Sequence, residues 1–165
     1  MTLIEFFDDV PIDNMVSCLS IKPEKVVFVG DKKPMKKQED VYLRLTEKYN
    51  IQVVFEYVRV NPRNELVSFF SKLPFNVEED KRIDVALAIC AVNYWLADGS
   101  FDYDLSDGSI LFRLTSSYKE STLGEALFEY MVVVSAATVD NYNDKFFMMS
   151  KGMMTYQQFI EAHDD

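Results

Sequence analysis

Cysteine, histidine and glycine are scarce in this chain of 165 residues, which has two cysteines, one histidine and five glycines. Cys18 and Cys90 stand far apart in apolar surroundings, so we expect buried thiols in a reducing compartment, the cytoplasm, and no disulfide framework. The single histidine, His163, lies in an acidic tail. Nothing there fixes its tautomer or excludes water, so we expect a solvated residue without an acid–base role.

Long apolar runs and the common catalytic motifs are also missing. No run approaches the ~20 apolar residues of a membrane span, and the acidic first residues are unlike a secretion signal, so we expect no membrane partner. The sequence has no GxSxG, GxxxxGK[ST], GxGxxG or CxxC motif. A nucleophile elbow, a phosphate loop and a zinc knuckle are therefore unsupported. We expect no cofactor, no metal, no catalytic residue and hence no enzyme.

What the chain does have is a globular composition and a lopsided charge. Hydrophobic residues make up 48% and charged residues 27%, which is typical of a folded domain. The net charge of −10 is concentrated in the second half, because residues 1–82 carry −1 and residues 83–165 carry −9. Such an acidic surface repels phosphate backbones, so we expect no nucleic acid duplex as a partner.

The first fifty residues predict a βαβα segment. Thr2–Phe7 is a short apolar strand, and Pro11 favours the first turn of a helix that follows it. Lys25–Gly30 is a continuous apolar run, which is typical of a parallel strand buried on both faces. Met35–Tyr49 has the spacing of an amphipathic helix. We treat residues 1–50 as one segment and residues 51–165 as a second domain.

The sequence of the second domain predicts an α+β fold, in which helices pack on an antiparallel sheet. The expected order is a strand pair at 51–60 and 65–73, a helix at 78–97, a hairpin at 101–114, a helix at 123–139 and a short terminal helix. Capping signals mark the three helix starts: Asn76 with Glu79, Thr122 with Glu125, and Thr155 with Gln158. The helix at 78–97 is apolar nearly all round, so we expect it in the middle of the domain.

Two patterns of acidic residues are candidate metal-binding sites, and each also has a simpler interpretation. Asp102, Asp104 and Asp107-Gly108 resemble a calcium loop, but Asp107 and Arg113 stand where that loop needs Gly and Glu. Asp-Gly between two alternating runs predicts a hairpin turn instead. The triplets Asp31-Lys32-Lys33 and Glu79-Asp80-Lys81 have the form of a metal-dependent nuclease motif, which needs a further acid on a neighbouring strand.

Two further clusters are candidate binding residues. Four lysines follow the buried strand and lead into a helix N-terminus, where backbone N–H groups favour anions; they are Lys32, Lys33, Lys36 and Lys37. The alternative is a solvated lysine face. The helix at 123–139 carries more apolar surface than one sheet face can cover. Its candidate interface residues are Leu127, Tyr130, Met131 and Val134. Either the N-terminal segment or a second copy covers this helix, and we expect the second copy and thus a homodimer.

A spaced pattern of residues runs through the second domain, at Pro74, Asn93, Gly99, Phe101, Asp104, Asp107, Gly108, Ile110, Arg113, Asp140 and Tyr142. Through these positions the stretch from about residue 73 to 162 resembles the YbjN-like family of bacterial sensory-transduction regulators. The resemblance implies a fold like that of type III secretion chaperones, used to bind another protein and generally dimeric. Residues 1–66, with "VVFVGD" and "MKKQEDVYLRL", are similar to the start of CARF-type proteins, which bind cyclic oligoadenylates.

These observations support three hypotheses of different classes. The leading one is a non-enzymatic, cytoplasmic protein-binding or regulatory module of the YbjN-like class. The alternative is a small nucleotide-sensing module in which the four lysines meet the phosphates of a cyclic oligoadenylate. The third is a metal-dependent nuclease.

Overall fold

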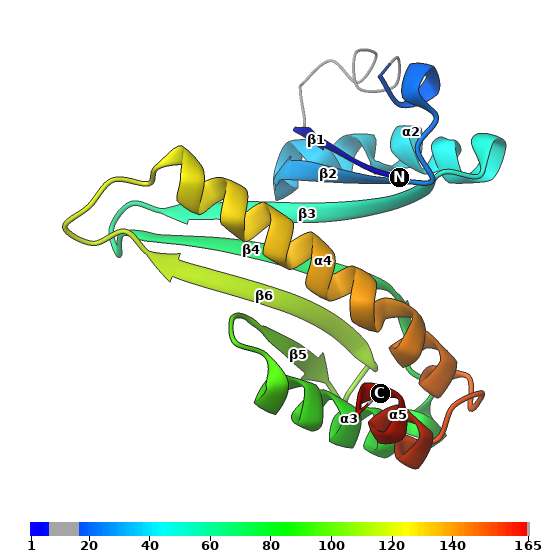
Figure 1. The fold of residues 1–165 in the computed structure, drawn as a ribbon. Helices are drawn as coiled ribbons and strands as arrows, with labels where there is room; N and C mark the ends of the chain where they lie inside the picture. The colour runs from blue at the N-terminus through cyan, green and yellow to red at the C-terminus, as the bar shows by residue number, and fades with distance from the viewer. Residues whose placement is uncertain (7–16, 165) are drawn as a thin grey trace. The chain divides into compact units, whose positions relative to one another are not determined.

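The computed structural model describes residues 1–6 and 17–164, and these residues form two compact units. Unit 1 comprises Met1–Phe69 and Ser116–Thr122, and unit 2 comprises Phe70–Thr115 and Leu123–Asp165. Strands β4 and β6 run from one unit into the other, so the chain crosses between the units within regular structure. The elements are labelled in Figure 1.

The described strands form one mixed, six-stranded sheet in the order β1-β2-β3-β4-β6-β5. Their bounds are β1 Thr2–Phe6, β2 Lys25–Asp31, β3 Gln52–Asn61, β4 Leu66–Asn76, β5 Ser100–Asp104 and β6 Ser109–Ser117. The pairs β1–β2 and β2–β3 are parallel, and the pair β5–β6 is antiparallel. The predicted α+β character is confirmed, and the predicted parallel and antiparallel portions belong to a single sheet rather than to separate ones.

Unit 1 has its core on the central strand β2. Residues Val26 to Val29 are buried, as expected for an apolar strand flanked by parallel neighbours on both sides. Helix α2, Lys32–Tyr49, packs on this strand through the Phe28–Tyr42 ring pair, whose centroids are 4.2 Å apart. The helix begins three residues before the predicted Met35. The helix predicted after Pro11 lies mostly outside the described residues. Residues 17–21, which are described, are helical.

Unit 2 contains the predicted hairpin. Strands β5 and β6 pair from Ser100↔Arg113 to Asp104↔Ser109, and residues 105–108 form the turn. Gly108 has φ +76°, and its N–H donates to the Asp104 carbonyl at 2.8 Å. A positive φ is the reason for glycine at this position. The Asp-Gly signal therefore predicted the hairpin correctly, although the loop has four residues.

Three helices and one short 3₁₀ turn complete unit 2. They are η1 Glu79–Lys81, α3 Arg82–Trp95, α4 Glu125–Ser150 and α5 Tyr156–Asp164. The Thr155 capping box is confirmed, because the Gln158 N–H donates to the Thr155 Oγ1 at 3.2 Å and the Thr155 N–H donates to the Gln158 Oε1 at 2.9 Å. Among the helices that the structure describes, none combines the length and apolarity of a bilayer span.

The other two capping predictions are wrong. Gly124, not Thr122, is the N-cap of α4, and no side chain caps it. Asn76 ends strand β4, and its side-chain amide donates to the Asp107 carbonyl at 3.0 Å. In both places the four-residue spacing is present in the sequence, but the chain is still extended or in a loop there. Helix α4 also continues to Ser150, eleven residues beyond the predicted Val139.

Candidate functional site

Helix α3 has two apolar faces, of which one is exposed. Its buried face consists of Val85, Ala88, Ile89 and Val92. On the opposite side the exposed fractions of the side chains are 67% for Ile83, 49% for Leu87 and 87% for Tyr94, and Cys90 is also exposed. We call Ile83, Leu87, Cys90 and Tyr94 the α3 stripe. The helix predicted to lie in the middle of the domain is therefore peripheral, and the prediction of a buried Cys90 is wrong.

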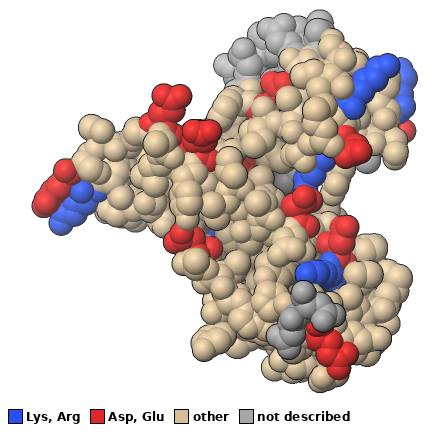
Figure 2. Space-filling model, viewed as in Figure 1, with Lys and Arg blue, Asp and Glu red and all other residues tan. Residues whose placement is uncertain are grey.

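The surroundings of the α3 stripe carry little charge. Ala86 and Ala91 lie beside it, both half-buried, and α3 has only Arg82 and Asp84 as charged residues, both at its start. In Figure 2 the part of the lower surface that lies over α3 is mainly tan, which marks uncharged residue types. Exposed apolar side chains that are grouped on an uncharged surface, as Ile83, Leu87 and Tyr94 are, are typical of contact sites between polypeptides.

Asn93 fixes α3 to the hairpin. Its side-chain amide donates to the Phe101 carbonyl at 3.0 Å, and its Oδ1 accepts the Phe101 N–H at 2.8 Å. One side chain thus satisfies both backbone groups of a strand residue, which holds the helix at a set height and rotation. The buried ring of Phe101 continues this anchor by packing against Tyr142 and Phe146 of α4, with centroids 5.8 and 5.2 Å away.

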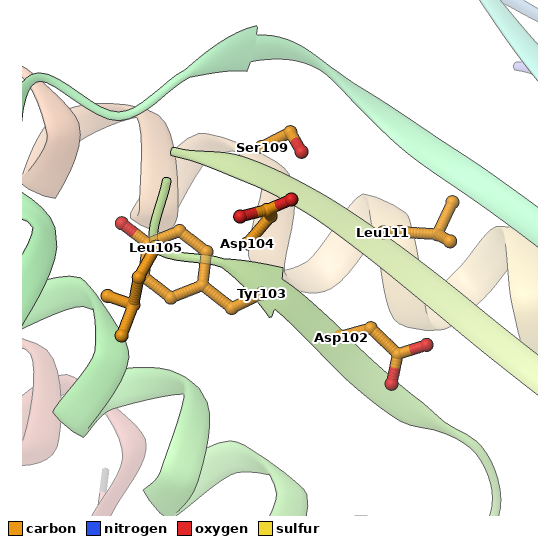
Figure 3. Close-up of a pocket in the computed structure, with 6 residues that line it drawn as sticks. All are labelled: Asp102, Tyr103, Asp104, Leu105, Ser109 and Leu111. Atoms are coloured by element: carbon orange, nitrogen blue, oxygen red, sulfur yellow. The ribbon is translucent and has the colours of Figure 1, made fainter. Parts of the chain in front are cut away.

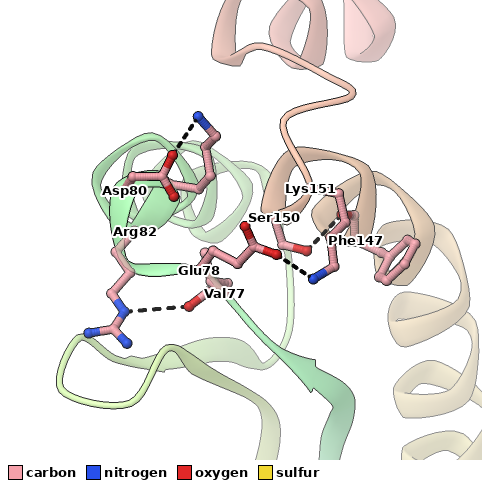
Figure 4. Close-up of polar contacts among 8 residues, drawn as sticks. Val77, Glu78, Asp80, Arg82, Phe147, Ser150 and Lys151 are labelled. Carbon is pink, nitrogen blue, oxygen red and sulfur yellow. Dashed lines mark hydrogen bonds and ion pairs between the residues drawn. The ribbon is translucent and has the colours of Figure 1, made fainter.

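Arg82 fixes the first turn of α3. Its guanidinium donates to the Val77 carbonyl at 3.4 Å and to the carbonyls of Leu105 and Ser106 at 3.0 and 3.1 Å. It therefore joins the turn of the hairpin to the segment that leads into α3. Figure 4 shows the contact to Val77, and beside it the ion pair between Glu78 and Lys151 at 2.7 Å, which ties the same segment to the end of α4.

The last turn of α3 is held by aromatic stacking. Trp95 stacks on His163 with ring centroids 3.7 Å apart, and on Phe159 with centroids 6.5 Å apart. Both partners belong to α5. His163 is half-buried in this stack, so the expectation of a solvated terminal histidine is wrong. Arg82 holds the first turn of α3, and Asn93 and the Trp95 stack hold its last turns. The helix that carries the α3 stripe is therefore fixed to the rest of unit 2 at both ends.

The acidic residues of the hairpin have structural partners. The Asp104 carboxylate accepts from the Ser106 hydroxyl and N–H, and the Asp107 carboxylate accepts from the Ser109 N–H at 2.8 Å. These hydrogen bonds lower the pKa of both carboxyl groups below their usual value. Asp102 forms a two-point ion pair with Arg113, at 2.9 and 3.0 Å. The hairpin interpretation of this cluster is confirmed.

An open depression lies on the face of the hairpin that carries Asp102 and Asp104. In Figure 3 Asp102, Asp104, Ser109 and Leu111 extend from this face, and Tyr103 and Leu105 complete the lining. Within the described part of the chain, no three metal-ligating side chains come together to hold an ion. The depression therefore offers two acids, and one of them is already paired with Arg113.

Most positions that carry the YbjN-like pattern lie in the hairpin or in the contacts that hold α3 and α4 against it. Gly99 and Gly108 have φ +75° and +76°, and a Cβ atom on either would press against the Phe112 ring or the Val77 backbone. Asn93, Phe101 and Tyr142 form the anchor described above. The pattern therefore describes how the hairpin and its helices are joined, and none of these residues lies in the α3 stripe.

The candidate interface residues of α4 lie on different faces of that helix. Met131 is buried within its own chain, Leu127 and Val134 are half-buried, and Tyr130 is exposed. Tyr130 donates its hydroxyl to the Asp98 carboxylate, and this hydrogen bond raises the pKa of the tyrosine. Among these four side chains Tyr130 is the most exposed, at 46%, and Val133, which is 50% exposed, lies three residues further along α4.

The candidate anion-binding lysines are all exposed in the first half of α2. Lys32, Lys33, Lys36 and Lys37 lie at the carboxyl end of β2, as the sequence predicted. Asp31, however, already accepts the Lys33 N–H at 2.9 Å, so a carboxylate of the chain occupies the start of this helix. Lys32 lies over the Tyr57 ring, with its Nζ 5.7 Å from the centroid.

The two acid–lysine triplets lie in different local structures. Asp31-Lys32-Lys33 spans the junction of β2 and α2, whereas Glu79-Asp80-Lys81 is the 3₁₀ turn η1. Asp80 pairs with Lys81 at 2.9 Å, which lowers the pKa of the aspartate and raises that of the lysine. At neither triplet does the described part of the chain bring three metal-ligating side chains together.

No protein-family model and no curated protein sequence matches this chain. The resemblances to YbjN-like and CARF-type proteins thus stay predictions from the sequence.

Proposed function

We propose that this protein is a non-enzymatic protein-binding or regulatory module of the YbjN-like, type III secretion chaperone-like class, acting in the cytoplasm. The observation that carries the proposal is the α3 stripe, an uncharged apolar surface three helical turns long on the outer side of a well-anchored helix. Covering large apolar side chains with a partner is favourable, by about 25 cal/mol for each Å² of apolar surface removed from water. Another polypeptide is the partner class that fits such a surface.

The acidic hairpin supports a binding role over a catalytic one. Asp104 and Asp107 bind their own turn, and Asp102 pairs with Arg113. Groups engaged in this way shape the loop, and the two acids that line the depression, Asp102 and Asp104, are held by Arg113 and Ser106 rather than left free to transfer a proton.

A photoreactive phenylalanine analogue placed at residue 87 tests the proposal. We expect ultraviolet light to join it to another polypeptide in living cells, because Leu87 lies in the centre of the α3 stripe. The matched control places the analogue at residue 133, which is equally exposed on α4. Adducts at residue 87 and few at residue 133 support the proposal. No adduct at residue 87, or equal yields at the two sites, contradicts it.

A nucleotide-sensing role is the second candidate, favoured by the four exposed lysines at the carboxyl end of β2. Under the leading proposal we expect calorimetry with cyclic oligoadenylates to show no binding, since Asp31 places a negative charge where a phosphate would approach. Micromolar binding that is lost in Lys32→Ala/Lys33→Ala would favour nucleotide sensing instead. Arg44→Ala/Lys48→Ala, two exposed cations further along α2, controls for a general effect of charge.

A further inference from the structure

We propose that the α3 stripe binds an amphipathic helix of another protein, one that carries a net positive charge around its apolar face. The proposal rests on the proposed function, because it names the chemistry of the polypeptide that covers the stripe. Three features of the chain carry it: the spacing of the stripe, the charged and aromatic groups at its two ends, and the charge of the chain that surrounds it.

The spacing of the α3 stripe suits a partner helix. Its members follow each other at intervals of four, three and four residues, from Ile83 to Tyr94. A repeat of about 3.5 residues keeps one line of side chains facing a partner helix. The stripe extends over roughly 17 Å of α3, so about three turns of a partner helix cover it. We expect that helix to bind through apolar anchors at positions such as i, i+3 and i+7.

Two carboxylates without an ion pair lie at the start of the stripe. Glu79 and Asp84 are exposed, and neither forms an ion pair within the described part of the chain. Asp84 precedes Leu87 by three residues, so the two side chains are neighbours on the surface of α3. Arg82, the one cation of α3, is bound to carbonyls of the hairpin turn instead. A cation of the partner can therefore pair with these carboxylates while its apolar face covers Leu87.

The other end of the stripe also favours a cation. The Tyr94 side chain is 87% exposed, and a lysine or arginine is attracted to the face of such a ring by its negative charge density. Asp98, whose carboxylate accepts the Tyr130 hydroxyl, adds a negative charge four residues after Tyr94. Both ends of the stripe thus attract positive charge, and its middle, Leu87 and Cys90, carries none.

The charge of the surrounding chain disfavours anionic occupants. Residues 83–165 carry a net charge of −9, and two of their four cations, Arg113 and Lys151, are paired with Asp102 and Glu78. Within a Debye length of about 8–10 Å such a surface repels nucleic acids and anionic membranes. It also repels a second copy of this chain, whose stripe is bordered by the same carboxylates. A cationic polypeptide is the occupant that this field attracts.

Binding of synthetic peptides to the full chain, followed by fluorescence anisotropy, tests the proposal. The probe is a helical peptide of about 14 residues, with leucine at every third or fourth position and lysine on both sides of that face. We expect a dissociation constant in the micromolar range, since the contact is smaller than a standard interface. A peptide with glutamate in place of lysine should not bind. A peptide of the same composition in scrambled order should bind at least about 10-fold more weakly.

A first pair of protein variants tests the apolar contact. Leu87→Gln should weaken the binding of the lysine peptide by about 10-fold or more, because it removes the central contact without changing the charge. Val133→Gln is the matched control, since Val133 is 50% exposed and Leu87 is 49% exposed. We expect this control to bind like the wild type. Circular dichroism of both variants checks that they are folded.

A second pair tests the charge. Glu79→Gln/Asp84→Asn removes the two carboxylates at the start of the stripe and should weaken the binding by about 3–10-fold at low salt. High salt should reduce this difference, because the pairs are exposed. The control, Glu125→Gln/Glu129→Gln, removes two exposed carboxylates from the first turns of α4. It changes the net charge equally, and we expect less than about 2-fold weaker binding from it.

Other results would overturn the proposal and leave the proposed function standing or not. No binding of the lysine peptide by the wild type, equal binding of the lysine and glutamate peptides, or no loss in Leu87→Gln excludes a cationic helix as the occupant. If residue 87 still forms adducts in living cells, another kind of polypeptide covers the stripe and the proposed function stands. If residue 87 forms none, both are wrong.

Two further measurements identify a different occupant. A wild type that approaches twice the 19.2 kDa chain mass in sedimentation equilibrium, with Leu87→Gln remaining at 19.2 kDa, would assign the stripe to a second copy. Binding to vesicles that contain phosphatidylserine, lost in Leu87→Gln and kept in Val133→Gln, would assign it to a membrane. Either result overturns the proposal. We expect a wild type whose mass does not depend on Leu87 and which does not bind these vesicles.

Discussion

Replacing Phe146 by alanine should lower the free energy of unfolding by about 3–5 kcal/mol, the usual cost of truncating a fully buried aromatic side chain. Phe146 has no exposed surface, and its ring packs against Phe101, Tyr142 and Phe159 at centroid distances of 5.2 to 5.9 Å. The change would leave a cavity where the hairpin, α4 and α5 meet. Urea denaturation followed by circular dichroism measures the loss.

The neighbouring Phe147 is the matched control for this change. It is 39% exposed and meets the Phe75 ring at 5.4 Å, so Phe147→Ala should cost about 1 kcal/mol. Equal losses for the two variants, or a loss below about 0.5 kcal/mol for Phe146→Ala, would show that α4 does not bury Phe146 in this way.

Gly108→Ala should destabilise the protein by about 2–4 kcal/mol, for two reasons that add. The residue has φ +76°, which strains any residue with a Cβ atom. The new Cβ would also press against the Val77 carbonyl and lie 2.9 Å from the Val77 nitrogen, whose N–H donates to the Gly108 carbonyl. The variant must therefore separate the hairpin turn from the start of η1 or distort both. Thermal unfolding of the variant measures this.

Gly124→Ala is the control for the loss of a glycine as such. Gly124 has φ −83°, and a Cβ atom there would meet nothing within 4 Å. Its replacement should cost less than about 1 kcal/mol, mainly through a poorer N-cap of α4. If Gly108→Ala proved as mild as this control, the close contact between the hairpin turn and Val77 would not exist in solution.

The sequence determined the features that depend on residues close together in the chain. The Thr155 box, the Asp107-Gly108 turn and the apolar run of β2 each require only neighbours within a few positions, and all three are present in the structure. The lysines of α2 were also placed correctly, because a helix start after a buried strand is a local event. Capping and turn formation are short-range hydrogen-bonding problems, so short patterns report them.

Local patterns failed where the outcome depended on elements distant in sequence. The Thr122 and Asn76 signals have the same spacing as the Thr155 box, yet Thr122 lies in a loop and Asn76 ends β4, where its amide binds a carbonyl of the hairpin turn. His163 was expected in solvent because its partner, Trp95, lies 68 positions earlier in the chain. No short window of sequence contains both members of such a pair.

The α3 stripe shows the same division most clearly. The sequence by itself predicted a helix at 78–97 that is apolar nearly all round, and the structure forms α3 from residues 82–95 of it. It could not determine which of the two apolar faces would be covered, since Ile83 and Ile89 are equal in hydrophobicity and differ only in what packs against them. Tertiary structure decided this when Asn93 and Arg82 fixed the rotation of α3 against the hairpin. That rotation buries Val85, Ala88, Ile89 and Val92 and leaves the stripe outside, because burial is a property of the whole packing arrangement and not of a residue.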